Sequence, residues 1–137
     1  MKRQFLFFFV TVCFFSCGKS SDSSSSVTDV SGNWHGTLVA ASNANANGTF
    51  IMTINQNGTT LSGTLATTTY CCTAGPYNFT GSISGNTIQL TYSGNNGKAN
   101  LNATISGKTF TGSFNETNGV LGFNAAMTTG TWQGTNP

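Results

Sequence analysis

The sequence predicts an all-β protein, an eight-stranded antiparallel up-and-down meander barrel that follows a signal peptide and a disordered Ser-rich tether. Three observations lead to this fold class. From Val30 onward, apolar residues alternate with Thr, Ser or Asn at a period of two, as in half-buried strands. Asn-Gly and Ser-Gly pairs, which favour tight turns, interrupt the alternation about every ten residues. No stretch has helical periodicity.

Residues 1–16 are predicted to be a signal peptide. Lys2 and Arg3 precede an apolar run from Phe5 to Phe15, which is too short to span a bilayer as a helix. The small residue before Cys17 resembles the lipobox of bacterial lipoproteins, although Phe14 stands where Leu is usual. This resemblance implies that Cys17 is acylated with palmitate and becomes the first mature residue. The alternative is a plain secretory signal cut nearby, with Cys17 a simple thiol.

Residues 17–29 form the predicted tether. A run of serines without apolar residues has nothing to bury, so we expect an extended and flexible chain between the lipid and the barrel. The barrel domain is predicted to occupy residues 30–137.

Eight strands are predicted within this domain, each recognised by three apolar or small residues on one face. In order, these faces are Trp34-Gly36-Leu38, Phe50-Met52-Ile54, Leu61-Gly63-Leu65, Phe79-Gly81-Ile83, Ile88-Leu90-Tyr92, Leu101-Ala103-Ile105, Phe110-Gly112-Phe114 and Phe123-Ala125-Met127, with Trp132 extending or closing the last strand. Glycines at the centre of many faces favour closure of the meander, because small barrels need close approaches there. A two-sheet sandwich of the same strands is the alternative.

The turns between the strands predict which way the barrel points. Tight turns are expected at Asn47-Gly48, Asn57-Gly58, Ser84-Gly85-Asn86, Asn96-Gly97, Ser106-Gly107-Lys108 and Asn118-Gly119. The longest loops are expected at 40–48 and 70–76. Because strands alternate in direction, both long loops should lie at the end opposite the tether, where a mouth would carry Tyr70, Tyr77, Cys71 and Cys72.

The adjacent Cys71 and Cys72 are the cysteines that remain in the domain once Cys13 leaves with the signal and Cys17 takes lipid. In an oxidising compartment they can form a disulfide with each other or reach another molecule. Alternatively, they are two small, partly buried side chains at a loop. Two thiols without a nearby His do not predict a metal site.

Charged residues make up only 6% of the chain, where about 25% is usual. From Cys17 onward, Lys19, Lys98 and Lys108 balance Asp22, Asp29 and Glu116, so three charges oppose three and the net charge is zero. This excludes a polybasic nucleic-acid surface. It also argues against an acid/base enzyme, and we predict neither catalysis nor a cofactor.

Gly32-Asn33-Trp34 before a meander is similar to the Gly-x-Trp opening of calycin-like barrels of the lipocalin and avidin type. The Arg that packs over this Trp in lipocalins is missing, because no Arg follows Arg3. The stretch from Ser31 to Gln133 resembles, more closely, small uncharacterised bacterial lipoproteins that open with Gly-x-Trp-x-Gly and close with Gly-Thr-Trp. This resemblance implies a barrel in the bacterial cell envelope, lipid-anchored at the outer membrane, and supplies no activity.

Two functions remain open. One is a surface binding or interaction module that meets a glycan or a protein through its outward Thr, Ser and Asn side chains, a face whose simplest role is solvation. The other is a carrier of a small apolar ligand in the barrel mouth, for which the candidate binding residues are Tyr70, Tyr77, Tyr92, Phe50 and Phe79. A solidly packed interior would argue against the carrier hypothesis, because side chains can just fill the inside of an eight-stranded barrel.

Overall fold

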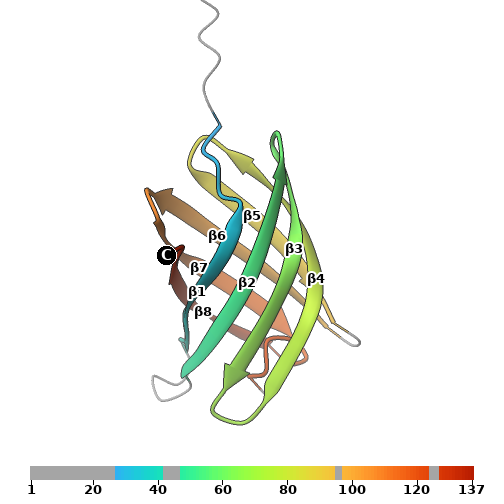
Figure 1. Ribbon diagram of the computed structural model, residues 1–137. Coiled ribbons are helices and arrows are strands. Elements are labelled where there is room, and N and C mark those ends of the chain that lie inside the picture. Colours follow the sequence, from blue (N-terminus) through green and yellow to red (C-terminus); the bar gives the residue numbers. More distant parts are fainter. Residues whose placement is uncertain (1–26, 42–46, 95–96, 124–126) are drawn as a thin grey trace, which may run out of the picture.

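The computed structural model describes residues 27–41, 47–94, 97–123 and 127–137. They form one closed antiparallel barrel in which each strand pairs with its neighbours in the sequence and β1 pairs with β8 (Figure 1). The strands are β1 (Gly32–Ala40), β2 (Asn47–Asn57), β3 (Thr60–Thr69), β4 (Thr73–Ser84), β5 (Thr87–Ser93), β6 (Lys98–Ser106), β7 (Thr109–Thr117) and β8 (Met127–Thr135). The predicted meander barrel is confirmed, and the sandwich alternative is excluded by the pairing of β1 with β8.

Alternating burial along the strands separates the inside of the barrel from the outside. In β5 and β6 every second residue is buried, and the residues between them are exposed Thr, Ser, Asn, Gln or Lys. An aromatic cluster fills the interior, with the Phe110 and Trp132 rings 4.2 Å apart and the Trp34 and Phe50 rings within 6 Å of Phe110. Both indole N–H groups are satisfied, since Trp34 donates to the Val30 carbonyl and Trp132 to the Asn102 carbonyl, each at 2.9 Å.

Glycine permits the close approach of strands β6 and β7. A Cβ atom added at Gly112 would collide with the carbonyl oxygen of Asn102 on the neighbouring strand. The predicted role of inward glycines in closing the barrel is therefore confirmed at this position.

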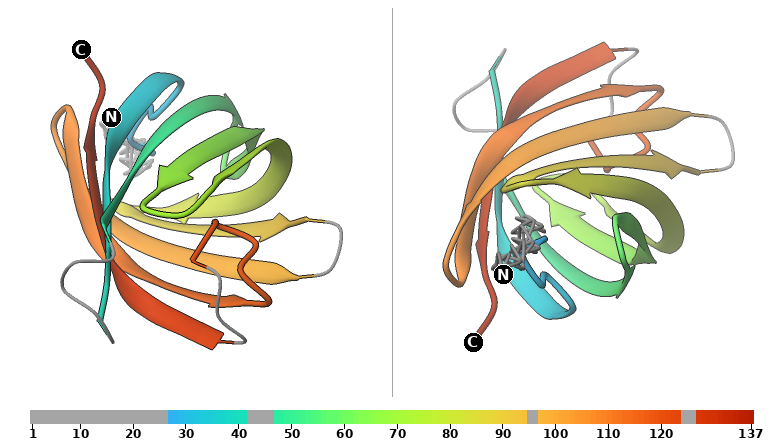
Figure 2. Two further views of the ribbon diagram at one scale, coloured as in Figure 1. Left: turned by 90° about the horizontal axis from the view of Figure 1, so that it is seen from below. Right: turned by 90° about the horizontal axis from the view of Figure 1, so that it is seen from above.

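The two ends of the barrel differ. We call one the tether end, because Val27–Ser31 lie there, and the other the loop end. At the tether end the hairpins turn tightly at Gly58, Gly85 and Gly107, each with φ between 56° and 60°. Thr28 hydrogen-bonds to Asn86 there, and Gln56 accepts from the Val30 N–H at 2.8 Å. The loop end carries the β3–β4 hairpin and the segment after β7 (Figure 2), so the predicted polarity is confirmed.

Two predicted connections are wrong in detail. The loop after β3 is only 70–72, because Thr73–Pro76 belong to β4 and the register shifts between Leu65 and Thr67. Gly75 and Pro76 make up this bulge, which accommodates a proline that has no N–H to donate to the ladder. Asn47 and Gly48 are the first residues of β2 rather than a turn.

The last strand also starts later than predicted. Asn118 and Gly119, expected to form a tight hairpin turn, instead begin a longer connection, and β8 begins at Met127. Phe123 is buried but belongs to this connection and not to the strand, and Ala125 lies outside the described residues. Within the described residues, no helix is long and apolar enough to span a membrane. The predicted signal peptide and Cys17 lie outside those residues.

Candidate functional site at the loop end

The connection after β7 covers the loop end of the barrel. We call its residues 118–123 the plug. Val120, Leu121 and Phe123 are buried, and Phe123 stacks on Phe114 with ring centroids 5.5 Å apart. Seen from the loop end, this segment lies across the opening of the barrel (Figure 2, left). The interior beneath the plug is therefore shielded from solvent by side chains of the chain itself.

Two buried threonines on β3 hold the plug in place. The Thr67 hydroxyl donates to the Leu121 carbonyl at 2.7 Å, and the Thr69 hydroxyl donates to the Gly122 carbonyl at 2.6 Å. Gly122 has a φ of 92°, a conformation that favours glycine, and its N–H closes a turn onto the Gly119 carbonyl. These contacts attach the plug to β3, a strand more than 50 residues earlier in the sequence.

Cys71 and Cys72 form a disulfide between adjacent residues at the tip of the β3–β4 hairpin. The Cys71 sulfur lies 3.0 Å from the Gly122 carbonyl oxygen, and the Cys72 carbonyl accepts from the Thr69 N–H at 2.8 Å. The disulfide therefore sits against the plug. Of the alternatives open from the sequence, the structure has the bond between neighbours, on a hairpin that is exposed to solvent.

The five candidate ligand-binding residues do not form one wall. Phe50 belongs to the aromatic cluster around Phe110 and Trp132, whereas Phe79 and Tyr92 are buried elsewhere in the barrel. Tyr77 is half-buried and its ring packs on Tyr92 with centroids 5.4 Å apart. Tyr70 is 62% exposed at the hairpin tip. Tyr77, Phe79 and Tyr92 are near one another, because Phe79 is the cross-strand partner of Tyr92, whereas Phe50 and Tyr70 lie apart from them.

Glu116 is the charged group that the barrel buries most deeply among those described. Its side chain is 2% exposed, and its Oε2 accepts from the Leu121 N–H of the plug at 2.5 Å. Burial raises the pKa of the carboxyl above its ordinary value, an effect opposed by the Leu121 N–H, the Thr128 hydroxyl and the Phe123 N–H, which favour the ionised form. Its second oxygen, Oε1, has no hydrogen bond of ordinary geometry to the described residues.

The Tyr92 hydroxyl is a second buried polar group without a hydrogen-bond partner in the described part of the chain. Burial is the main cause that raises the pKa of Tyr92, and electrostatic interactions with Tyr77 and Glu116 raise it further. Tyr92 and Glu116 both pair with Ala99 in the sheet register, from β5 and β7, and the Tyr77 and Tyr92 rings are 5.4 Å apart. Polar groups that are buried without partners are uncommon in folded proteins.

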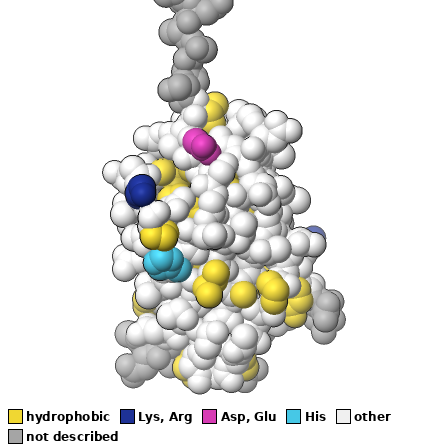
Figure 3. Space-filling model, in the orientation of Figure 1, with side chains coloured by type: hydrophobic (Ala, Val, Ile, Leu, Met, Phe, Trp, Pro, Cys, Tyr) yellow, Lys and Arg dark blue, Asp and Glu magenta, His cyan; other side chains and the backbone are white. Residues whose placement is uncertain are grey.

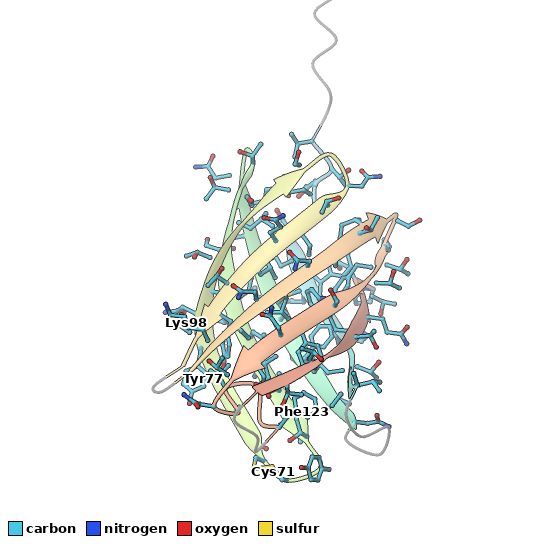
Figure 4. The ribbon with its side chains drawn as sticks, turned by 180° about the vertical axis from the view of Figure 1, so that it is seen from behind. Cys71, Tyr77, Lys98 and Phe123 are labelled. Atoms are coloured by element: carbon cyan, nitrogen blue, oxygen red, sulfur yellow. A yellow bond between two sulfur atoms is a disulfide. The ribbon has the colours of Figure 1, made fainter. Side chains whose placement is uncertain are left out.

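A hollow of about 260 Å³ opens at the loop end, beside the plug. Its side-chain walls come from Cys72, Thr73, Ala74, Tyr77, Asn118 and Val120. Gly94, Gly97, Gly119 and Gly122 supply backbone without side chains. Figure 4 shows Tyr77 and Phe123 at this end of the barrel, together with Cys71 and Lys98.

The sequence prediction missed Glu116, Thr67, Thr69 and the plug. The sequence did contain a signal for the polar residues. Side chains two residues apart in a strand face the same way, so Glu116 points inward with Phe114, and Thr67 points inward with Leu65. Polar residues at inward positions therefore indicate where a second segment of chain has to meet the barrel. Nothing comparable indicated that residues 118–123 would fold over the opening.

A cluster of metal ligands is not found in the described ranges. No group of three or more His, Cys, Asp and Glu residues lies together there. His35 is exposed on the outside of β1, with its Nε2 3.5 Å from the Thr135 hydroxyl. The chain matches no family model, no curated protein and no solved structure. The resemblance to calycin-like lipoproteins therefore stays a prediction.

Proposed function

We propose that the protein is a lipid-anchored lipoprotein of the bacterial cell envelope whose non-catalytic barrel is a surface binding module. The observation that carries this proposal is that the predicted lipid attachment and the candidate binding features belong to opposite ends of the barrel. The chain that follows the predicted lipid attachment enters at the tether end. The hollow, the disulfide and the exposed Tyr70 lie at the loop end, where a barrel held at a membrane would present them outward.

The outer surface supports a binding role without proton chemistry. It is almost free of charged side chains in the view of Figure 3. Uncharged side chains bond to one another across the strands, as from Asn100 to Asn115 at 3.1 Å and from Thr53 to Asn33 at 2.9 Å. Such a surface can exchange hydrogen bonds with a glycan or a protein, and it gives no electrostatic attraction to nucleic acid.

The anchor is tested with two matched cysteine variants. We expect Cys17→Ala to abolish incorporation of labelled palmitate and to release the protein from the membrane fraction. Cys13→Ala, four residues earlier in the same leader, should leave both unchanged. Continued labelling and membrane retention of Cys17→Ala would contradict the anchor.

The binding end is tested by photo-crosslinking in living cells. A photoreactive phenylalanine analogue is placed at Tyr70, which is 62% exposed at the loop end, or at Ile51, which is 68% exposed on the wall of β2. We expect crosslinked products at position 70 in excess of those at position 51. Equal products at both positions, or products only at position 51, would contradict a binding role for the loop end.

A carrier of a small apolar ligand remains the second candidate function. The hollow at the loop end favours it, because Tyr77, Val120 and Ala74 give it apolar walls. Phe50, Phe79 and Tyr92, expected from the sequence to line such a site, are instead packed inside the barrel. Native mass spectrometry of the purified protein tests this candidate: a co-purified lipid of constant mass supports it, and a bare protein mass counts against it.

A further inference from the structure

The two sulfur atoms of the Cys71–Cys72 disulfide have different surroundings. The Cys71 sulfur lies 3.0 Å from the Gly122 carbonyl oxygen of the plug and 3.9 Å from the Thr69 hydroxyl oxygen. Apart from the disulfide itself, the Cys72 sulfur has no such polar neighbour among the described residues. Cys72 borders the loop-end hollow of about 260 Å³, whose lining does not include Cys71. One sulfur therefore rests against the plug, and the other belongs to a residue with open space beside it.

This difference decides which sulfur a thiol can attack. Both residues are exposed, and Cys71 lies at the end of the β3–β4 hairpin (Figure 4). A thiolate breaks a disulfide by bonding to one sulfur while the other leaves. A thiolate that attacks Cys71 has to approach the Gly122 carbonyl oxygen, whose partial negative charge repels it. At Cys72 the hollow gives the incoming group room, so attack there is favoured.

The Gly122 carbonyl also provides a partner for the sulfur that leaves. In the disulfide, Cys71 has no hydrogen to donate to this oxygen. Once Cys71 is a thiol, its S–H can donate to the Gly122 carbonyl from its present position. A thiol at Cys72 has no acceptor of this kind among the described residues. Cys71 is therefore the better leaving group of the two.

We propose that the Cys71–Cys72 disulfide is a thiol-exchange site for a low-molecular-weight thiol, with Cys72 as the sulfur attacked and Cys71 as the sulfur that leaves. The thiolate bonds to the Cys72 sulfur as the bond to Cys71 breaks, and Cys71 takes the electron pair and then a proton from water. A second thiolate attacks the sulfur of the first thiol, and Cys72 leaves and is protonated in the same way. Two small thiols are thus oxidised to one disulfide as the protein disulfide is reduced to two thiols. This stoichiometric exchange goes beyond the binding role proposed above and does not depend on it.

Glutathione is the probe for the position of attack. The full chain is purified with Cys13→Ser and Cys17→Ser, which leaves Cys71 and Cys72 as its cysteines. The oxidised protein is treated with glutathione, free thiols are blocked with N-ethylmaleimide, and tandem mass spectrometry locates both groups. We expect glutathione on Cys72 in about fivefold excess over Cys71, a ratio that one hydrogen bond can produce. In urea, where the plug is unfolded, the two sulfurs should be attacked about equally.

Two single-cysteine variants in the same background make the comparison where the ring cannot close again. Cys71→Ser keeps a hydroxyl that can donate to the Gly122 carbonyl, whereas Cys72→Ser leaves Cys71 as the thiol. Each is equilibrated with glutathione and glutathione disulfide. The mixed disulfide at Cys72 should form with an equilibrium constant about fivefold larger, because the one at Cys71 loses its S–H donor to Gly122. These variants decide the position even where ring closure removes the adduct from the parent.

The proposal is overturned if glutathione prefers Cys71, if the folded and unfolded parent give the same ratio, or if the two variants form mixed disulfides equally. It is also overturned if thioredoxin reduces the folded protein and glutathione does not, because the site would then serve a protein dithiol. Crosslinking at position 70 tests the binding role separately.

Discussion

Replacing Thr67 with Val tests how the plug is held. Thr67 is 1% exposed, and its hydroxyl donates to the Leu121 carbonyl at 2.7 Å. Valine has nearly the same shape, so the substitution removes the donor without leaving a large cavity. The buried Leu121 carbonyl then loses this bond, which costs about 1–3 kcal/mol, and the more apolar valine side chain returns part of it. We expect the free energy of unfolding to fall by about 1–2 kcal/mol.

Urea unfolding measures this loss. With a slope of about 1.5 kcal/mol per molar urea, the midpoint should fall by about 1 M. The matched control is Thr68→Val, one residue further along β3 on the exposed outer face, which should change the stability by about 0.5 kcal/mol or less.

Amide hydrogen exchange locates the effect. The Leu121 and Gly122 amides of the plug are hydrogen-bonded to Glu116 and Gly119, and they should exchange about tenfold faster in Thr67→Val if opening of the plug becomes easier by about 1.4 kcal/mol. Amides in the middle of β5 and β6 should change less. If Thr67→Val and Thr68→Val have the same midpoint and the same exchange at Leu121, the reasoning about the plug is refuted.

Three further predictions concern the charge, the strand packing and the disulfide. Glu116→Gln should flatten the pH dependence of stability. Because the folded pKa of Glu116 is raised, the parent loses stability as the pH rises above the carboxyl's ordinary value of 4.5, by up to about 1.4 kcal/mol per pH unit. Thermal melts between pH 4 and pH 8 whose midpoints decline equally in both proteins would contradict this. Gly112→Ala, whose new Cβ meets the Asn102 carbonyl, should lower the free energy of unfolding by about 3 kcal/mol or more. Gly58→Asn, at a φ of 60° in open space, should lower it by less than about 1 kcal/mol. Equal urea midpoints for the two variants would disprove the steric argument. Cys71 and Cys72 should resist iodoacetamide until a reductant is added, which mass spectrometry of the 71–72 peptide detects, and alkylation without reductant would show free thiols.

The barrel could be predicted from the sequence because its strands carry both necessary signals. In the hairpin from β4 to β5, alternation ends at Ile83 and resumes at Ile88, and Gly85 supplies the positive φ that a two-residue turn requires. Period and turn agree there, and the predicted pairing is the observed one. At Gly75 and Pro76 they disagree, because a proline usually marks a loop, whereas here a bulge keeps it within a strand.

The loop end could not be predicted in the same way, because its contacts are not periodic. Thr67 meets Leu121 and Thr69 meets Gly122 across more than 50 residues, and no local pattern connects them. Asn118-Gly119 has the composition of a hairpin turn and does adopt positive φ, at 55° and 65°, yet the chain continues into the plug rather than into a strand. Local turn chemistry specifies a change of direction and leaves open what the next residues cover.

The pairing of β1 with β8 has a consequence for copies of the protein that stand close together. An open sheet presents a row of unpaired N–H and C=O groups along its outer strands, and these can add a strand from a neighbouring molecule. Here the pairing from His35 with Thr135 to Ala40 with Gly130 occupies that row. A molecule with three positive and three negative charges from Cys17 onward has no net repulsion to keep its copies apart. Closure of the ring supplies that protection through geometry, so a dense array of these barrels can remain free of strand exchange.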